Sequence, residues 1–233
     1  MSGAARDGQL CRALIEACGD VQRLGLTHGT SGNVSIRRDA DSFFVSPTGL
    51  PYDSLEPPDI PLMRFDGRWY GRRRPSSEWR FHRDILAARP EAGAIVHAHP
   101  RYATALACTG RGIAAFHYMV AVAGGADIRC APYHTFGTQL LSDAALAALE
   151  DRRACLLAHH GIIALGVDVN AALRLAAQVE DLAAQYAAAL AIGGVTLLDA
   201  AEMAQVVEKF RTYGRQDAED ADLEHAGDRP PAL

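Results

Sequence analysis

Apolar side chains recur at helical spacing in several segments of the chain. The first segment runs from Leu10 to Leu24, with an apolar residue at every third or fourth position, and Gly25 follows it as a helix-stop signal. The same spacing, with serine at some starts and glycine or proline near some ends, predicts further helices. They are expected between Ser76-Ser77 and Arg89-Pro90, after Pro100 through Leu106, from Ser142, over 170–190 and over 200–210.

Short segments rich in β-branched and apolar residues lie between these helices and predict strands. The predicted strands are Asn33–Arg37, Ser42–Ser46 after a polar turn at 38–41, a buried strand within 93–100, and a second buried strand at 154–159. Gly161, which follows the last of them, is interpreted as a turn. Strands alternate with helices along the chain, which favours a layered α/β domain.

The size and composition of the chain fit one domain. It has 233 residues, of which 49% are hydrophobic and 22% are charged, as in ordinary globular proteins. We assign residues 1–214 to this domain. Residues 215–233 are acidic and lack a hydrophobic period, so we predict a disordered tail there.

Composition also excludes several classes of function. No apolar run approaches the roughly 20 residues that span a bilayer, and the N-terminal residues lack the apolar core of a secretory signal. The net charge of -5 provides no basic surface for nucleic acid. Five scattered cysteines without a C-x-x-C motif are typical of reduced thiols in a cytoplasmic protein.

The first candidate chemistry is a histidine pair, His97-x-His99, in the predicted strand before Pro100. Residues two apart in a strand share one face, so two imidazoles would project side by side. That arrangement suits zinc, which accepts imidazole nitrogen. The alternative, one hydrogen-bonded core histidine and one exposed histidine, is about equally compatible with the pattern.

A second histidine pair, His159-His160, lies at the end of the strand predicted at 154–159. Either residue could complete a three-histidine site. Three protein ligands with an open fourth position are typical of a catalytic zinc. Sequence spacing does not show that the two histidine-bearing strands are neighbours.

Ser76-Ser77-Glu78 begins a predicted helix, where hydroxyls, free N–H groups and the helix dipole favour an anion. A plain N-cap is the commoner meaning of such serines. Glu78 is the only acid in this segment, and a carboxylate beside a metal-held carbonyl compound is a natural base for an α-proton. The glycine- and hydroxyl-rich loops at 29–33 and 46–49 could likewise hold a phosphate or form plain turns.

Taken together, these segments resemble the class II aldolase and adducin family, and within it the bacterial aldolases of the L-fuculose-phosphate type. The matching blocks follow one another in order and extend over most of the chain before Arg215. They are residues 25–26 with 29–35, 47–49 with 51–52, 75–82, 96–99, 117–119 with 123–125, 130–138, 156–161 and 209–214. Agreement over so many separated blocks is far more specific than any single motif.

The resemblance implies a single three-layer α/β domain with a central, mainly antiparallel sheet flanked by helices. It also implies a homotetramer with active sites between subunits. The activity it implies is reversible cleavage of a ketose 1-phosphate, such as L-fuculose 1-phosphate, to dihydroxyacetone phosphate and a small aldehyde such as L-lactaldehyde.

The resemblance also assigns roles to individual residues. One Zn²⁺ per subunit, or another divalent metal such as Mn²⁺ or Co²⁺, would be bound by His97, His99 and His160. Glu78 would be the catalytic acid and base, with Tyr118 from a neighbouring subunit and Tyr213 transferring protons at the aldehyde end. The substrate phosphate would be held by Thr30, Gly32, Asn33, Thr48, Gly49, Ser76 and Ser77.

Other activities on the same scaffold stay open. They are an aldolase for 5-deoxyribulose or methylthioribulose 1-phosphate, a pentulose-phosphate 4-epimerase, a dehydratase and a decarboxylase. A non-catalytic adducin-like module would be expected to lose metal ligands, whereas all three histidines and Glu78 are present. A Schiff-base aldolase has little support, because Lys209 in the predicted C-terminal helix is the only lysine.

Overall fold

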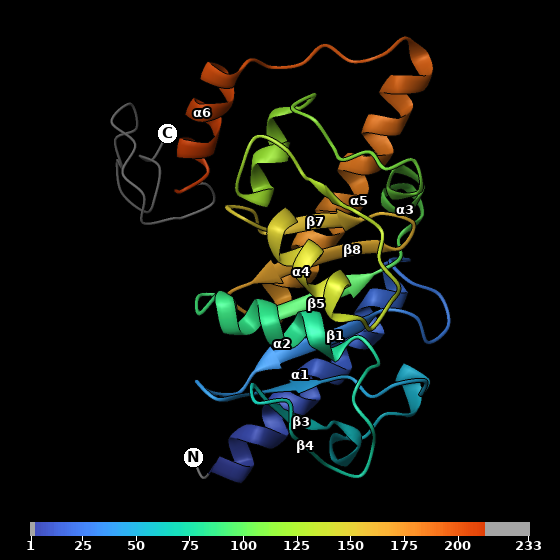
Figure 1. Ribbon diagram of the computed structural model, residues 1–233, viewed down its shortest axis with the longest axis vertical. Coiled ribbons are helices and arrows are strands. Elements are labelled where there is room, and N and C mark those ends of the chain that lie inside the picture. The colour runs from blue at the N-terminus through green and yellow to red at the C-terminus, as the bar shows by residue number, and fades with distance from the viewer. Residues whose placement is uncertain (1–2, 213–233) are drawn as a thin grey trace, which may run out of the picture.

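The computed structural model describes residues 3–212, so our predictions for Tyr213 and for the tail at 215–233 fall outside them. An eight-stranded sheet runs through the molecule in the order β4-β3-β2-β1-β5-β8-β7-β6 (Figure 1). Its strands are β1 (Asn33–Arg37), β2 (Ser42–Val45), β3 (Leu62–Arg64), β4 (Trp69–Tyr70), β5 (Ala94–Ala98), β6 (Cys130–Ala131), β7 (Ala154–Leu157) and β8 (Gly161–Gly166). Neighbouring strands are antiparallel except β6 and β7, which confirms the expected mainly antiparallel sheet.

Helices cover both faces of this sheet. The α-helices are α1 (Gly3–Arg23), α2 (Trp79–Ala88), α3 (Arg101–Cys108), α4 (Gln139–Ala148), α5 (Val169–Ile192) and α6 (Ala200–Lys209). Short 3-10 helices are η1 (Tyr52–Ser54), η2 (Pro57–Asp59) and η3 (Tyr118–Ala123). In Figure 1, α2 and α4 lie in front of the sheet, and α1 and α5 lie behind it. Among residues 3–212, no helix is long and apolar enough to cross a membrane.

The alternation of side chains along the strands builds a core on each face of the sheet. In β5, Ala94 and Val96 belong to the core with α1, α3 and α5, whereas Ile95 belongs to the core with α2 and α4. His97 therefore points to the α2 side, where it contacts the ring of Phe81. The five cysteines are unpaired, as predicted.

Helix α4 begins earlier than the sequence pattern predicted. Thr138 is its N-cap, and the Thr138 hydroxyl accepts a hydrogen bond from the N–H of Leu141 at 3.3 Å. Ser142, the predicted start, is fully buried inside the helix, and its hydroxyl donates to Asp84 on α2 at 2.6 Å. Ser142 therefore joins two helices instead of capping one.

The connection between β7 and β8 also differs from the prediction. Strand β7 ends at Leu157, and Gly161, interpreted from sequence as a turn, is the first residue of β8, which sequence reasoning missed. A side-chain carbon at Gly161 would lie 2.3 Å from the carbonyl oxygen of Ala98, so only glycine lets β8 approach β5 this closely. This tight packing brings His160, the residue before Gly161, next to the end of β5.

Candidate active site

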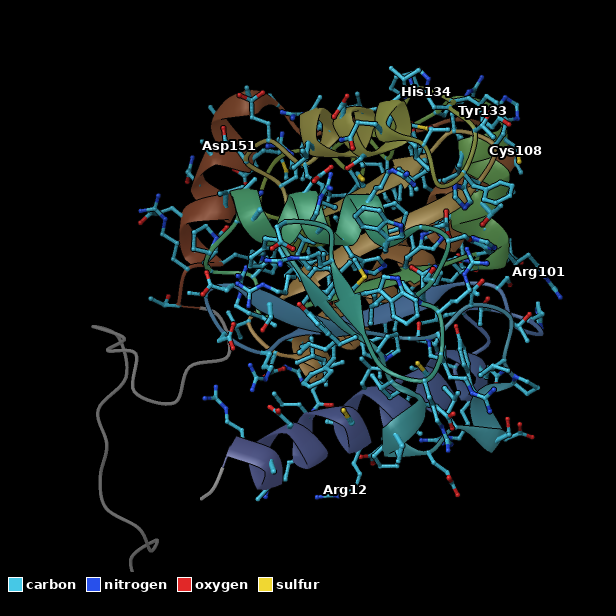
Figure 2. The ribbon with its side chains drawn as sticks, turned by 60° about the horizontal axis from the view of Figure 1, so that its bottom comes forward. Arg12, Arg101, Cys108, Tyr133, His134 and Asp151 are labelled. Atoms are coloured by element: carbon cyan, nitrogen blue, oxygen red, sulfur yellow. The ribbon has the colours of Figure 1, made fainter. Side chains whose placement is uncertain are left out.

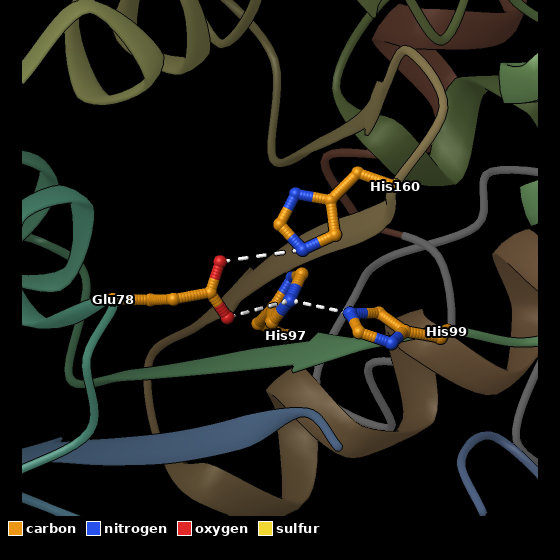
Figure 3. A group of neighbouring side chains, drawn as sticks. All are labelled: Glu78, His97, His99 and His160. Carbon is orange, nitrogen blue, oxygen red and sulfur yellow. Dashed lines mark hydrogen bonds and ion pairs between the residues drawn. The ribbon is translucent and has the colours of Figure 1, made fainter. Parts of the chain in front are cut away.

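Three imidazoles converge where β5 ends and β8 begins (Figure 3). His97 lies in β5 opposite Ile163 of β8, and His99 follows β5 directly. The Nε2 atoms of His97 and His99 are 2.9 Å apart, and the ring of His160 lies 4.8 Å from that of His97. The structure thus brings together the three histidines predicted as metal ligands.

Glu78 completes this cluster from the opposite side. It is the residue before α2, and its side chain is buried. Its Oε2 lies 3.2 Å from Nε2 of His97, and its Oε1 lies 3.2 Å from Nε2 of His160. One ligand atom from each of the four residues lies within 4.8 Å of all the others.

The hydrogen-bonding chemistry of the cluster calls for a cation. Nδ1 of His97 lies 2.8 Å from the carbonyl oxygen of Ile162, which can only accept, so Nδ1 carries a hydrogen and Nε2 is the nitrogen left for a metal. In the neutral form of the ring, which is the form that binds a metal, Nε2 of His97 directs a lone pair at the Glu78 carboxylate 3.2 Å away. Among residues 3–212, Oε1 of Glu78 finds no hydrogen-bond donor. Facing lone pairs at this distance are unfavourable unless a positive charge lies between them.

The spacing of the donor atoms fits a metal ion. Ligands at about 2.0–2.1 Å from a tetrahedral zinc ion are roughly 3.4 Å from one another. The observed separations of 2.9 and 3.2 Å are close to this value. Three imidazole nitrogens and a carboxylate are also a donor set that zinc accepts.

Burial sets the protonation states that metal binding requires. It lowers the pKa of His99 to about 3 and that of His160 to about 4, with the neighbouring His97 acting in the same direction. Both rings are therefore neutral near pH 7, which is the ligand form. Burial alone would raise the pKa of Glu78, but His97, His160 and the Asn33 amide outweigh it and hold that pKa below its usual range.

The cluster opens into a cleft of about 350 Å³. All the residues predicted to hold the phosphate line this cleft together with Glu78, His99 and His160; they are Thr30, Gly32, Asn33, Thr48, Gly49, Ser76 and Ser77. The loop that carries Thr48 and Gly49 is joined to the loop that carries Ser76 and Ser77 by an isolated β-bridge between Pro47 and Pro75. A third is pressed against β5, since a side-chain carbon at Gly32 would lie 2.8 Å from the carbonyl oxygen of His97.

Aromatic and imidazole side chains also line the cleft. They are Tyr133, His134, Phe136 and His159. Figure 2 shows Tyr133 and His134 projecting at the surface, and the ring of Tyr133 meets that of His159 edge-on at 5.9 Å. His159 has a left-handed backbone, with a φ of 56°, and does not belong to the cluster of Glu78, His97, His99 and His160. Of the histidine pair 159–160, the structure therefore places His160 in the cluster and His159 in the cleft wall.

Tyr118 lies away from this cleft in its own chain. It begins η3, is 48% exposed, and stacks on His117 with 4.8 Å between ring centroids. The ring of Phe210 also lies near it, with 6.4 Å between the ring centroids of Tyr118 and Phe210. Tyr118 is not among the residues that line the cleft, and Tyr213 falls outside the described residues.

His82 is a residue of this region that sequence reasoning did not single out. It lies on α2, is fully buried, and its Nε2 is 2.5 Å from Oδ1 of Asn33, whose amide nitrogen donates to Glu78. A signal for it was available, because His82 follows Glu78 by one helical turn and stands next to Phe81 on the buried part of α2.

Comparison with known proteins agrees with this fold and site. Residues 12–187 match the family model "Class II Aldolase and Adducin N-terminal domain". The chain therefore belongs to the class II aldolase and adducin family, and its enzyme class is that of the class II aldolases, which are metal-dependent lyases.

Similar proteins of known name fall into two groups, which are named for different sugar phosphates. The 5-methylthioribulose-1-phosphate/5-deoxyribulose-1-phosphate aldolase of Rhodospirillum rubrum is 55% identical over 205 residues, which are 88% of this chain and 92% of the relative. The L-fuculose phosphate aldolase of Escherichia coli K12 is 47% identical over 207 residues, 88% of this chain and 96% of the relative. A solved structure of L-fuculose 1-phosphate aldolase superimposes with a TM-score of 0.84 at 38% identity, covering 87% of this chain and 96% of the other.

Proposed function

We propose that this chain is a zinc-dependent aldolase that reversibly cleaves a ketose 1-phosphate to dihydroxyacetone phosphate and a small aldehyde. The observation that carries the proposal is the convergence of three histidines and Glu78 beside a cleft rich in hydroxyls and backbone amides. L-fuculose 1-phosphate, which would yield L-lactaldehyde, is one candidate substrate. The relative at 55% identity supports 5-deoxyribulose or methylthioribulose 1-phosphate as the other.

His97, His99 and His160 are the residues that would hold the metal. When bound, zinc would supply Lewis-acid stabilisation of negative charge on substrate oxygens, typically worth several kcal/mol. Mn²⁺ or Co²⁺ could be held by the same donors.

The phosphate end of the substrate would lie against neutral donors. The predicted contacts, Thr30, Gly32, Asn33, Thr48, Gly49, Ser76 and Ser77, offer hydroxyls, an amide and backbone N–H groups, and no lysine or arginine lines the cleft within residues 3–212. The start of α2 beside Ser76 adds a favourable helix dipole. Binding energy from the phosphate would position the reacting carbons relative to Glu78.

Glu78 would move the proton at the substrate carbon. Its carboxyl is ionised at neutral pH because its pKa is lowered, so it can accept a proton. In the synthetic direction Glu78 would remove a proton from C3 of dihydroxyacetone phosphate, and in cleavage it would return that proton.

Tyr118 would act on a neighbouring subunit. Its ring is half exposed and outside the cleft of its own chain, as expected of a residue that completes a second subunit's site. We therefore propose a homotetramer with active sites between subunits, in which Tyr118 and Tyr213 exchange protons with the C4 hydroxyl and the departing aldehyde.

The test is to incubate zinc-loaded protein with dihydroxyacetone phosphate and L-lactaldehyde, acetaldehyde or methylthioacetaldehyde, and to identify the products. A ketose 1-phosphate is the expected product, and the fastest aldehyde names the substrate. If no ketose forms and dihydroxyacetone phosphate does not exchange its C3 proton with solvent, the aldolase proposal is wrong.

A further inference from the structure

A chain of buried hydrogen-bonding side chains connects Glu78 to the interior of the protein. It begins at Ser35 on β1, whose hydroxyl oxygen lies 2.7 Å from Nδ1 of His82. Nε2 of His82 lies 2.5 Å from Oδ1 of Asn33, and Nδ2 of Asn33 donates to Oε2 of Glu78 at 3.0 Å. Ser35 and His82 are 0% exposed, and Asn33 is 4% exposed, so bulk water does not reach these bonds.

The direction of every hydrogen bond in this chain follows from its last acceptor. An ionised carboxylate can only accept, so the Asn33 atom that faces Glu78 is the amide nitrogen and the atom that faces His82 is the carbonyl oxygen. That oxygen can also only accept, so Nε2 of His82 carries a hydrogen. Because burial lowers the pKa of His82 to about 3, the ring is neutral and its Nδ1 accepts from the Ser35 hydroxyl.

The reverse orientation of the Asn33 amide would be strongly unfavourable. It would turn the carbonyl oxygen of Asn33 towards the Glu78 carboxylate, and two buried acceptors would then face each other without water. The N–H of His82 favours the same orientation of the Asn33 amide as the Glu78 carboxylate does, because only the carbonyl oxygen of Asn33 can accept from it.

We propose that His82 is a positioning residue, which holds the Asn33 amide so that an N–H group is directed at Glu78. The proposal rests on the proposed role of Glu78 as the catalytic base. His82 does not line the cleft and is not one of the clustered metal donors, so it acts only through Asn33. Asn33 does line the cleft, and its amide nitrogen has a second hydrogen that a substrate could use.

Two substitutions at His82 test this role. His82→Gln keeps an N–H near the position of Nε2, whereas His82→Leu fills the space without a donor. The matched control is Ser142→Ala, which removes the hydrogen bond from buried Ser142 on α4 to Asp84 on α2 but lies outside the cleft. Zinc content, the KM for dihydroxyacetone phosphate and the rate of C3 proton exchange with deuterated solvent are measured for each protein.

We expect His82→Leu to keep its zinc and to show a modest rise in KM through Asn33, while the maximal exchange rate falls about 10- to 100-fold, because the base is no longer held in place. His82→Gln should recover most of that rate, and Ser142→Ala should match the wild type. An unchanged rate in His82→Leu, an equal loss in His82→Gln, or a loss that parallels loss of zinc would each overturn the proposal.

The ring itself provides a test that does not depend on a folded variant. In protein labelled with ¹⁵N-histidine, His82 should show a hydrogen on Nε2, none on Nδ1, and slow exchange with solvent. The opposite tautomer would refute the proposal even if no variant folds. If wild-type protein fails to exchange the C3 proton, the proposed function fails, whereas normal exchange in both wild type and His82→Leu overturns only the role of His82.

Discussion

At the residue scale, Glu78 combines two properties that rarely occur together. Its carboxylate is buried, which favours protonation, yet positive charge on the imidazoles of His97 and His160 and the N–H of Asn33 lower its pKa. A charge held in a dry position and directed at a cleft is the state expected of a proton acceptor.

Glu78→Gln tests that state. The amide cannot take up the substrate proton, so C3 proton exchange of dihydroxyacetone phosphate should fall by about 10²- to 10⁴-fold. The three histidines remain, so zinc should be retained. Glu150→Gln, which changes an exposed carboxylate outside the cleft, serves as the control. Full exchange in Glu78→Gln would refute its assignment as the base.

Two adjacent histidines provide a matched test of the metal centre. His160 belongs to the cluster and His159 to the cleft wall. We expect His160→Ala and His99→Ala to lose most of their bound zinc and their activity, and His159→Ala to purify with zinc. Elemental analysis of each variant measures this difference. Normal zinc content in His99→Ala or His160→Ala would show that the altered residue is not a ligand.

At the element scale, the close approach of β8 to β5 positions the histidines. His97 lies within β5, His99 follows β5, and His160 precedes β8, so the separation of these two strands sets the separation of the rings. Gly161 lies at this contact, where a side-chain carbon would be 2.7 Å from the ring of His99 as well as close to Ala98.

Gly161→Ala should therefore weaken both the fold and the metal site. The added methyl must push the two strand ends apart, which we expect to lower the free energy of unfolding by about 1–3 kcal/mol. Zinc affinity should fall as well. Urea unfolding and zinc titration measure the two effects. Gly8→Ala in α1 meets nothing closer than 3.5 Å and should leave both unchanged or raise stability slightly. Wild-type behaviour of Gly161→Ala would contradict this view of the β5–β8 contact.

At the scale of the whole molecule, acid should destabilise the metal-free protein. The pKa of His82 and that of His99 are lowered from 6.5 to about 3, and that of His160 to about 4. At a pH below 6.5 and above these lowered pKa values, the unfolded chain binds more protons than the folded one. Stability is therefore full above pH 6.5 and is lost as the pH falls through this window, by about 1.4 kcal/mol per pH unit for each fully responding histidine.

Urea unfolding of chelator-treated protein at pH 7, 6 and 5 measures this dependence. In His82→Gln the free energy of unfolding should depend on pH less steeply, by about one proton, because this variant lacks His82, one of the three histidines with a lowered pKa. A stability that does not change over this range would contradict the buried, neutral state of these rings.

Mixed oligomers test whether Tyr118 completes a neighbouring site. Glu78→Gln and Tyr118→Phe should each be nearly inactive, with the second reduced about 10- to 100-fold. In randomly mixed tetramers about one quarter of the sites would combine an intact Glu78 with an intact Tyr118 from the next subunit. Cleavage activity should then recover to about that fraction. No recovery on mixing would place both residues in the same chain's site or exclude the tetramer.

Local pattern by itself determined much of this protein. The periods of 3.6 and 2 in apolar residues located α1, α2, α5, β1 and β5, because each element buries one face against a core. The types and spacing of His97, His99 and Glu78 indicated metal and proton chemistry. Resemblance over many blocks of sequence added the roles of His160 and of the loops that form the cleft.

The tertiary structure alone decided which of these residues meet. Pairing of β5 with β8 and of β1 with β5 brings His160 and Asn33 beside His97, and such pairing depends on contacts between distant parts of the chain. Gly161 begins β8, at a position where the neighbouring strand leaves no room for a side chain, and this close contact is invisible in the local sequence. The burial of His82 behind Glu78 has the same origin, since packing of α2 on the sheet decides which side chains lose water and must bond to one another.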